Sequence, residues 1–444
     1  MTGHAPTAAG SVPAAVPAAG QVLRPSELPR ASSEAGRATA AALEVLRGNR
    51  RTGRSAELGA DYAFTCPSPT SYPFQWNWDS CFHAIALSRV APDLARREVD
   101  SLLLGADPGG FLPHMLLWQQ DARAAATEEF RIAMWDHWRT ATIAPPVLAR
   151  AVAAVHRATG DDAWLRSVLP AVAGHFDWLH AARAGRDGLL VIGQPDESGL
   201  DSTPKYDAVL GLDPRSPAVG PEWHAAMRAL IGERPAAADP SAFPSGRFQW
   251  VDVLLNTVYA DGLGCLADLA GADGARFRAR AATVLRSLLD GCWDERRGAF
   301  WDVDAVSGRR AEVLTASSLF PLVLADLPEP VVTALVDHLV DEDEFWLPYP
   351  VPSVAATEPS FDADFATGAI FRGSTWVNLN WYLHLGLRAH GRHDVADELA
   401  ARTVAMTAAA GMRECYGPFD ARGHGAHDFG WSALVLDLPT GAGA

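Results

Sequence analysis

The sequence lacks the features of a membrane protein, a disulfide-stabilised protein or a nucleic-acid-binding protein. None of its apolar runs approaches the roughly 18 residues that a bilayer-spanning helix needs. Its five cysteines are scattered without metal-ligand spacing, which favours buried thiols in a reducing compartment over a disulfide framework. Lysine and arginine (37) are outnumbered by aspartate and glutamate (53), and the net charge of −16 disfavours nucleic acid and anionic membranes as partners.

The first 30 residues, rich in alanine, proline and glycine, have neither the basic start nor the apolar segment of a secretory signal. We therefore expect a disordered N-terminal arm over residues 1–30 and a cytoplasmic protein. We expect no cofactor and no metal site. The expected partner is a small molecule. The sequence does not determine the oligomeric state, and a homo-oligomer is possible.

Helical periodicity dominates the rest of the chain, and 48% of its 444 residues are hydrophobic, enough for a large core. The predicted helices follow one another in pairs, with long loops containing glycine, proline and aromatic residues between them. Glycine or proline marks several of their ends, as Pro92 and Gly160 do. The predicted helices are 34–47, 78–90, 92–104, 142–159, 161–183, 252–270, 274–292, 315–325, 329–340, 373–390, 394–410 and 427–436.

About a dozen paired helices with long loops after alternate ones are typical of an all-α fold, the (α/α)6 barrel. A helical-repeat solenoid is the competing architecture, but the sequence shows no clean repeat of fixed period. We predict one catalytic domain over residues 31–440, with a loop insertion near 208–248. Residues 298–304 alternate enough to predict a small hairpin.

The loop at residues 194–207 is the first candidate for chemistry. It holds the carboxylates Asp196, Glu197 and Asp201 within six positions, between two prolines. A second acid, Glu414, lies 213 positions after Asp201 in another irregular, aromatic stretch. Glycoside hydrolysis needs one carboxylic acid to protonate the leaving oxygen and one carboxylate on the opposite face. A solvated acidic turn is the alternative for the first loop.

Several aromatic and polar residues near these loops are candidates to bind a sugar. Aromatic faces stack on sugar rings, although most tryptophans simply belong to the core. Asp79 either binds sugar hydroxyls or caps a helix. His114 is either a hydroxyl ligand or a core histidine. Arg372 either pairs with an acidic group or is a surface residue at a helix start. The predicted substrate-binding residues are Trp76, Trp78, Asp79, His114, Arg372, Trp376, Trp381 and Trp431.

Six motifs in a fixed order resemble glycoside hydrolase family 63, in particular its short bacterial branch of mannosylglycerate and glucosylglycerate hydrolases. The resemblance covers roughly residues 60–438. The motifs are Trp-Asn-Trp-Asp-Ser (76–80), Gly-Phe-Leu-Pro-His-Met (110–115), Asp-Glu-Ser-Gly-Leu-Asp (196–201), Arg-Gly-Ser-Thr-Trp-Val-Asn-Leu-Asn-Trp (372–381), Arg-Glu-Cys-Tyr-Gly-Pro-Phe-Asp (413–420) and His-Asp-Phe-Gly-Trp-Ser (427–432).

The resemblance implies an (α/α)6 barrel and an inverting mechanism on α-linked sugars. It implies that Asp201 is the general acid and Glu414 the general base, and that Asp79 holds hydroxyls of the sugar whose bond is cleaved. Glu197 is expected to shape the loop. Two positions depart from the family pattern: Asp196 replaces an aromatic residue, and Ala144 replaces a glutamine near the leaving group, which puts a glycerate leaving group in doubt.

From the residues alone, two other functions compete with a glycosidase. A sugar epimerase or isomerase on the same barrel would rely on histidines, of which His114, His137 and His384 are available. A non-catalytic carbohydrate-binding protein would keep the tryptophans and lose one of the acids. For the glycosidase, we expect burial and the neighbours Asp196 and Glu197 to raise the pKa of Asp201.

Overall fold

The structure is a computed structural model that describes residues 22–23, 29, 32–120, 123–124, 130, 132–185, 187–233, 239–242 and 246–439. The predicted N-terminal arm, residues 1–30, lies outside the described residues except at positions 22, 23 and 29.

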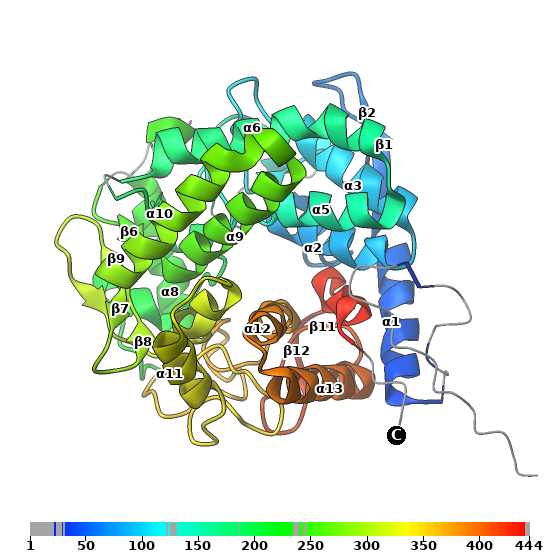
Figure 1. Ribbon diagram of the computed structural model, residues 1–444. Helices are drawn as coiled ribbons and strands as arrows, with labels where there is room; N and C mark the ends of the chain where they lie inside the picture. The colour runs from blue at the N-terminus through cyan, green and yellow to red at the C-terminus, as the bar shows by residue number, and fades with distance from the viewer. Residues whose placement is uncertain are drawn as a thin grey trace, which may run out of the picture.

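Six inner elements form a closed ring in the described part of the chain (Figure 1). Each contacts the next, and the last contacts the first. The inner elements are α2 (Asn77–Ser88), α5 (Leu148–Thr159), α9 (Val253–Leu269), the 3₁₀ helix η7 (Ala316–Val323), α12 (Val377–Ala389) and the 3₁₀ helix η8 (Gly430–Asp437).

An outer helix packs against each inner element and alternates with it along the chain. This arrangement of twelve elements confirms the predicted (α/α)6 barrel. The outer helices are α1 (Glu34–Gly48), α3 (Pro92–Leu104), α6 (Asp162–Arg183), α10 (Ala275–Gly291), α11 (Glu329–Leu339) and α13 (His393–Ala410).

Burial separates the two rings, as their sequences require. All twelve residues of α2 are buried, whereas α10 buries Phe277, Val284 and Leu288, one stripe of an amphipathic helix. Gly160 acts as predicted and ends α5 in the left-handed conformation (φ 63°). The Asp161 side chain accepts a hydrogen bond from the Trp164 backbone N–H and so caps the start of α6.

Several predicted helix limits differ from the structure, for identifiable reasons. α5 begins at Leu148 instead of 142, after the pair Pro145–Pro146, and η7, which contains Pro321, is a 3₁₀ helix. Proline removes a backbone donor that an α-helix needs. The predicted loop insertion contains a 14-residue helix, α8 (Val219–Gly232), together with α7 (Asp207–Leu210) and η5 (Pro240–Ala242). The limits of the catalytic domain stay a prediction.

Short antiparallel strands connect the helices. The predicted hairpin at 298–304 is wrong, because β8 pairs with β7 while β9 pairs with β6 and β10. The strands are β1 (Arg50–Arg54), β2 (Asp61–Thr65), β3 (Gln75–Trp76), β4 (Met115–Leu116), β5 (Val191–Ile192), β6 (Trp250–Val251), β7 (Trp293–Asp294), β8 (Ala299–Phe300), β9 (Asp302–Asp304), β10 (Arg310–Ala311), β11 (Arg413–Tyr416) and β12 (Gly423–His427).

Among the described residues, no helix combines the length and apolar character needed to cross a membrane.

Candidate active site

A narrow cavity lies where the N-terminal ends of α2, α12 and η8 meet the loop after β5 and strand β11. The centre of a water molecule can occupy about 60 Å³ of it. Asp201 and Glu414, the two predicted catalytic acids, both line this cavity despite their separation in sequence. The lining consists of Pro67, Tyr72, Trp76, Trp78, Asp79, His114, Gly199, Asp201, Ile370, Phe371, Trp376, Glu414, Phe429 and Trp431.

The carboxyl group of Asp201 lies in surroundings that favour its protonated form. Burial raises its pKa well above the ordinary value, and the carboxylates of Asp196, Glu414 and Asp79 raise it further. The expected contribution of Glu197 to this pKa is not among the main causes of the shift. A carboxyl group held neutral in this way is able to donate a proton.

Glu414 lies on β11 and is held by donors. The Tyr72 hydroxyl donates to its Oε1 (3.2 Å) and the Ala426 backbone N–H to its Oε2 (2.7 Å). Burial raises the pKa of Glu414, while the two donors and Arg413 lower it and so favour the carboxylate. Gly425 has a left-handed φ of 62°, and a Cβ there would collide with the Glu414 carboxylate.

Asp79 is the third carboxyl group in the cavity wall. It is buried in the first turn of α2, where burial raises its pKa well above the ordinary value and the charges of Glu414 and Glu98 add to the effect. The residue at the N-cap of α2 is Trp76, which makes no side-chain capping bond. The predicted role of Asp79 in binding hydroxyls therefore has the right location, beside both acids.

Aromatic rings enclose the cavity. The Trp431 ring makes T-shaped contacts with two other indole rings, and its centroid lies 5.4 Å from that of Trp78 and 5.7 Å from that of Trp376. The Phe371 ring stacks on Trp376 with a centroid distance of 3.8 Å. Among the described residues, the Nε1 atoms of Trp76 and Trp376 and the Nδ1 atom of His114 are buried without a hydrogen-bond partner. These atoms are available to form hydrogen bonds with a ligand in the cavity.

The loop that carries Asp201 is fixed by ion pairs on either side. Before the acid, both oxygens of Glu197 accept from Arg183 of α6 (2.8 and 2.9 Å), and neither side chain is exposed. Glu197 also accepts from the Ile143 and Gly193 backbones. Its expected role in shaping the loop is confirmed.

After the acid, Lys205 is the single lysine of the chain and is buried. Its Nζ lies 2.7 Å from both Asp252 and Asp302, and the Tyr206 hydroxyl bonds to the same two carboxyl groups. Gly199 lies between the two anchored segments with φ 75°, where a Cβ would collide with Trp78. The acid is therefore presented on a rigid support.

Two predicted substrate-binding residues do not reach the cavity. Arg372 is buried and forms a two-pronged ion pair with Asp207, so it braces the end of the acid loop and contacts neither acid. Trp381 lies one turn into α12, where its indole donates to Asp437 (3.0 Å) and its ring packs on Phe82. For these two positions the structure contradicts the prediction, since neither side chain lines the cavity.

Sequence reasoning missed Tyr72, Phe371 and Phe429 in the cavity wall. Tyr72 is in a Pro-Ser-Pro-Thr-Ser-Tyr-Pro loop just ahead of the tryptophan motif, and its proximity to that motif was the available signal. Phe371 precedes the Arg372 motif, and Phe429 is inside the last motif. No local pattern distinguishes either phenylalanine from a core residue.

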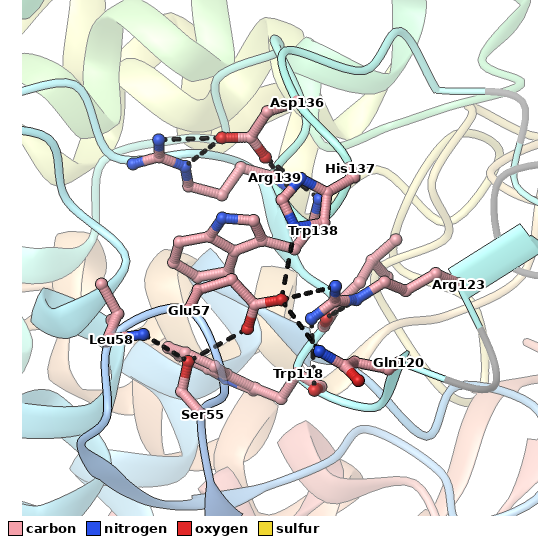
Figure 2. A network of polar contacts seen from close by, with 11 residues as sticks. Ser55, Glu57, Leu58, Trp118, Gln120, Arg123, Asp136, His137, Trp138 and Arg139 are labelled. Carbon is pink, nitrogen blue, oxygen red and sulfur yellow. Dashed lines mark hydrogen bonds and ion pairs between the residues drawn. The ribbon is translucent and has the colours of Figure 1, made fainter.

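The strand that leads away from His114 is anchored by a surface network (Figure 2). Glu57 accepts from Arg123 (2.7 Å), and Arg123 in turn donates to the Leu117 backbone beside β4 (2.8 Å). Arg123 lowers the pKa of Glu57 to about 2. The Nε2 atom of His137 lies 3.3 Å from the Glu57 carboxylate, and 68% of the His137 side chain is exposed.

The histidines do not form a catalytic pair. His114 lines the cavity, whereas His137 lies in the surface network and His384 bonds to the Ala396 backbone (2.9 Å). Burial lowers the pKa of His114 to about 4. This arrangement disfavours an epimerase that transfers protons between two histidines.

The two positions that depart from the resembled pattern are both buried. Asp196 accepts from the Gln194 amide (2.6 Å), and burial raises its pKa to about 6. Ala144 precedes the proline pair before α5. Neither residue is in the lining of the cavity.

Comparisons with known proteins agree with this geometry. Residues 72–432 match the mannosylglycerate hydrolase MGH1-like glycoside hydrolase domain. The chain is 29% identical to the mannosylglycerate hydrolase of Rubrobacter radiotolerans (84% of this chain, 92% of that one) and 30% identical to that of Thermus thermophilus (89% and 98%). It superposes on a crystal structure of the glycoside hydrolase family 63 mannosylglycerate hydrolase of Thermus thermophilus with Tris, with TM-score 0.78, 27% identity and coverage of 90% and 99%.

Proposed function

The chain belongs to the mannosylglycerate hydrolase MGH1-like glycoside hydrolases of family 63, and we propose that it cleaves a small α-glucoside or α-mannoside with inversion, using Asp201 as general acid and Glu414 as general base. The observation that carries the proposal is that these two acids, 213 positions apart, line one tryptophan-walled cavity. Its similarity to two mannosylglycerate hydrolases supports a short glycoside as the substrate class.

The proposed reaction is a single displacement, in which Asp201 donates its proton to the glycosidic oxygen as the bond to the sugar breaks. The raised pKa of Asp201 favours the protonated form that this step requires. The anchors at Glu197 and Lys205 keep the carboxyl group from turning away when it loses the proton.

In the same displacement, Glu414 removes a proton from a water molecule that attacks the anomeric carbon from the opposite face. The hydrogen bonds from Tyr72 and the Ala426 backbone orient the carboxylate for this step. Attack from the opposite face inverts the anomeric configuration, so an α-glycoside gives a β-sugar.

Asp79 and the unpartnered donors of the wall are proposed to bind the sugar itself. Asp79 accepts hydrogen bonds from its hydroxyls, while the indole N–H groups of Trp76 and Trp376 and the His114 ring bond to its oxygens. The aromatic faces exclude water, which strengthens these polar contacts.

The test uses charge-neutral variants of each acid. Asp201→Asn and Glu414→Gln should each lower kcat by about 10²–10⁴-fold on the best substrate from a panel of α-glucosides, α-mannosides and trehalose. Asp337→Asn and Glu295→Gln make the same chemical changes at exposed positions and should leave kcat unchanged. Near-wild-type hydrolysis by either active-site variant would end the assignment.

The same panel separates the competing functions. Conversion of a sugar to its epimer or isomer without release of a leaving group would identify an epimerase or isomerase. Saturable binding of the glycosides without turnover would identify a carbohydrate-binding protein. Hydrolysis with release of free sugar is the outcome expected here.

A further inference from the structure

A second cavity lies beside the acid loop and shares no lining residue with the catalytic cavity. The centre of a water molecule can occupy about 300 Å³ of it, five times the volume in the catalytic cavity. Its walls come from residues 204–214, Trp250 of β6, residues 309–313 and residues 358–360. This volume is at the lower end of the range for small-molecule sites, roughly 300–1,000 Å³.

Two polar groups of this wall are buried and bond to nothing in the described part of the chain. They are the indole Nε1 of Trp250, a residue 2% exposed, and the hydroxyl of Ser360, a residue 5% exposed. Buried donors without partners are rare in folded proteins and call for an explanation. A ligand oxygen in the cavity would satisfy the indole, and a ligand hydroxyl would satisfy the serine.

The charges in the wall exclude a strongly charged ligand. Lys205 is already paired with Asp252 and Asp302, and Asp207 with Arg372, so neither buried charge is left for a ligand. The mouth carries charges of both signs, with Arg309 and Glu312 both exposed. An ion of either sign would therefore find no excess of the opposite charge.

The remaining wall is apolar. It includes one large aromatic side chain, Trp250, with Val209, Leu212 and Val313 and three prolines. An apolar surface with a few hydrogen-bonding groups fits a ligand that has one apolar face and several hydroxyls. A sugar ring has both.

We propose that this second cavity is a binding site for a neutral, hydroxyl-rich ligand, one sugar ring or a short polyol, held by the Trp250 indole and the Ser360 hydroxyl. The site is independent of the glycoside that the catalytic cavity cleaves. It adjoins the acid loop, because Lys205 and Asp207 belong both to the cavity wall and to the anchors of that loop.

The test follows the indole signals of the full chain labelled with ¹⁵N-tryptophan. The Trp250 signal, assigned by its loss in Trp250→Phe, should shift and saturate during titration with D-glucose, D-mannose or glycerol. Ala208→Trp places a bulky side chain from an exposed position into the cavity and should abolish this shift. Ala229→Trp makes the same change on the exposed side of α8 and should preserve it.

A milder variant guards against a disturbed fold. Ser360→Ala removes one hydroxyl and should weaken binding at the Trp250 signal about threefold to tenfold, the loss expected for one neutral hydrogen bond. The signals of Trp76 and Trp376 report ligand binding in the catalytic cavity in the same spectra. An absence of binding in the catalytic cavity can therefore be distinguished from an absence of binding in the second cavity. A Trp250 signal that does not move, that moves without saturating, or that responds to inorganic phosphate instead would overturn the proposal.

Discussion

Removing the Tyr72 hydroxyl should change the pH at which the enzyme begins to work. This hydroxyl donates to Glu414 at 3.2 Å and so stabilises the carboxylate form. A hydrogen bond to a charged group contributes about 1.5–3 kcal/mol, and 1.36 kcal/mol corresponds to one pKa unit. Since 3.2 Å is long for an O–H···O bond, the lower value applies. Tyr72→Phe should therefore raise the pKa of Glu414 by about one unit.

The sign of the effect on activity follows from the role of Glu414. As a general base it works only when ionised, so a higher pKa removes activity at low pH. The acid limb of the kcat/KM profile should move up by about one pH unit, while the alkaline limb, set by Asp201, stays in place.

Tyr382→Phe is the matched control. Among the described residues, the Tyr382 hydroxyl is buried without a hydrogen-bond partner, and Tyr382 does not line the cavity. Its profile should match that of the unmodified enzyme. Lost packing alone would lower the Tyr72→Phe profile at every pH. A uniformly lowered profile with an unmoved acid limb, or a limb that moves to lower pH, would refute the assignment of Glu414 as base.

Three further predictions concern the supports of the site. Glu197→Gln removes the carboxylate that pairs with the buried Arg183 and should cost about 3–5 kcal/mol of unfolding free energy in urea titrations; an unchanged stability would contradict its structural role. Asp196→Asn removes a charge that raises the pKa of Asp201, so the alkaline limb of the pH profile should move to lower pH, and an unmoved limb would count against the coupling. Glu57 has a folded pKa lowered to about 2, so its stabilisation is present above its unfolded value of about 4.5 and is lost as pH falls through about 2. The stability difference between the unmodified chain and Glu57→Gln should therefore narrow between pH 6 and pH 3.5, and a difference that does not change with pH would be inconsistent with the Arg123 pairing.

Most of the barrel was predictable because each helix carries its own periodic signal and end signals. Gly160 and Asp161 place a helix boundary from local chemistry alone. The helix α8 was not predicted, because several prolines and weak periodicity in its neighbourhood favour a loop. The hairpin at 298–304 was wrong because its two halves are separate strands with different partners, β7 for β8 and β6 and β10 for β9, which the local alternation does not reveal.

The site residues that belong to sequence motifs were predictable. Those whose role depends on a partner far away in the sequence were not. Asp79, His114 and the paired tryptophans follow from motifs and do line the cavity. Arg372 is the opposite case: its partner Asp207 is 165 positions away, and the pairing turns a candidate ligand into a brace. The hydrogen bond between Tyr72 and Glu414 spans 342 positions, so sequence spacing gives no indication of it.

The stereochemistry of the first product molecules tests the central claim most directly. Proton NMR recorded from the start of hydrolysis, before mutarotation, distinguishes the two anomers of the released sugar. A direct attack by water that Glu414 activates, with Asp201 protonating the leaving oxygen, predicts that the β-anomer appears first from an α-glycoside. Initial release of the α-anomer would contradict this account, because it would require a covalent intermediate or attack from the same face.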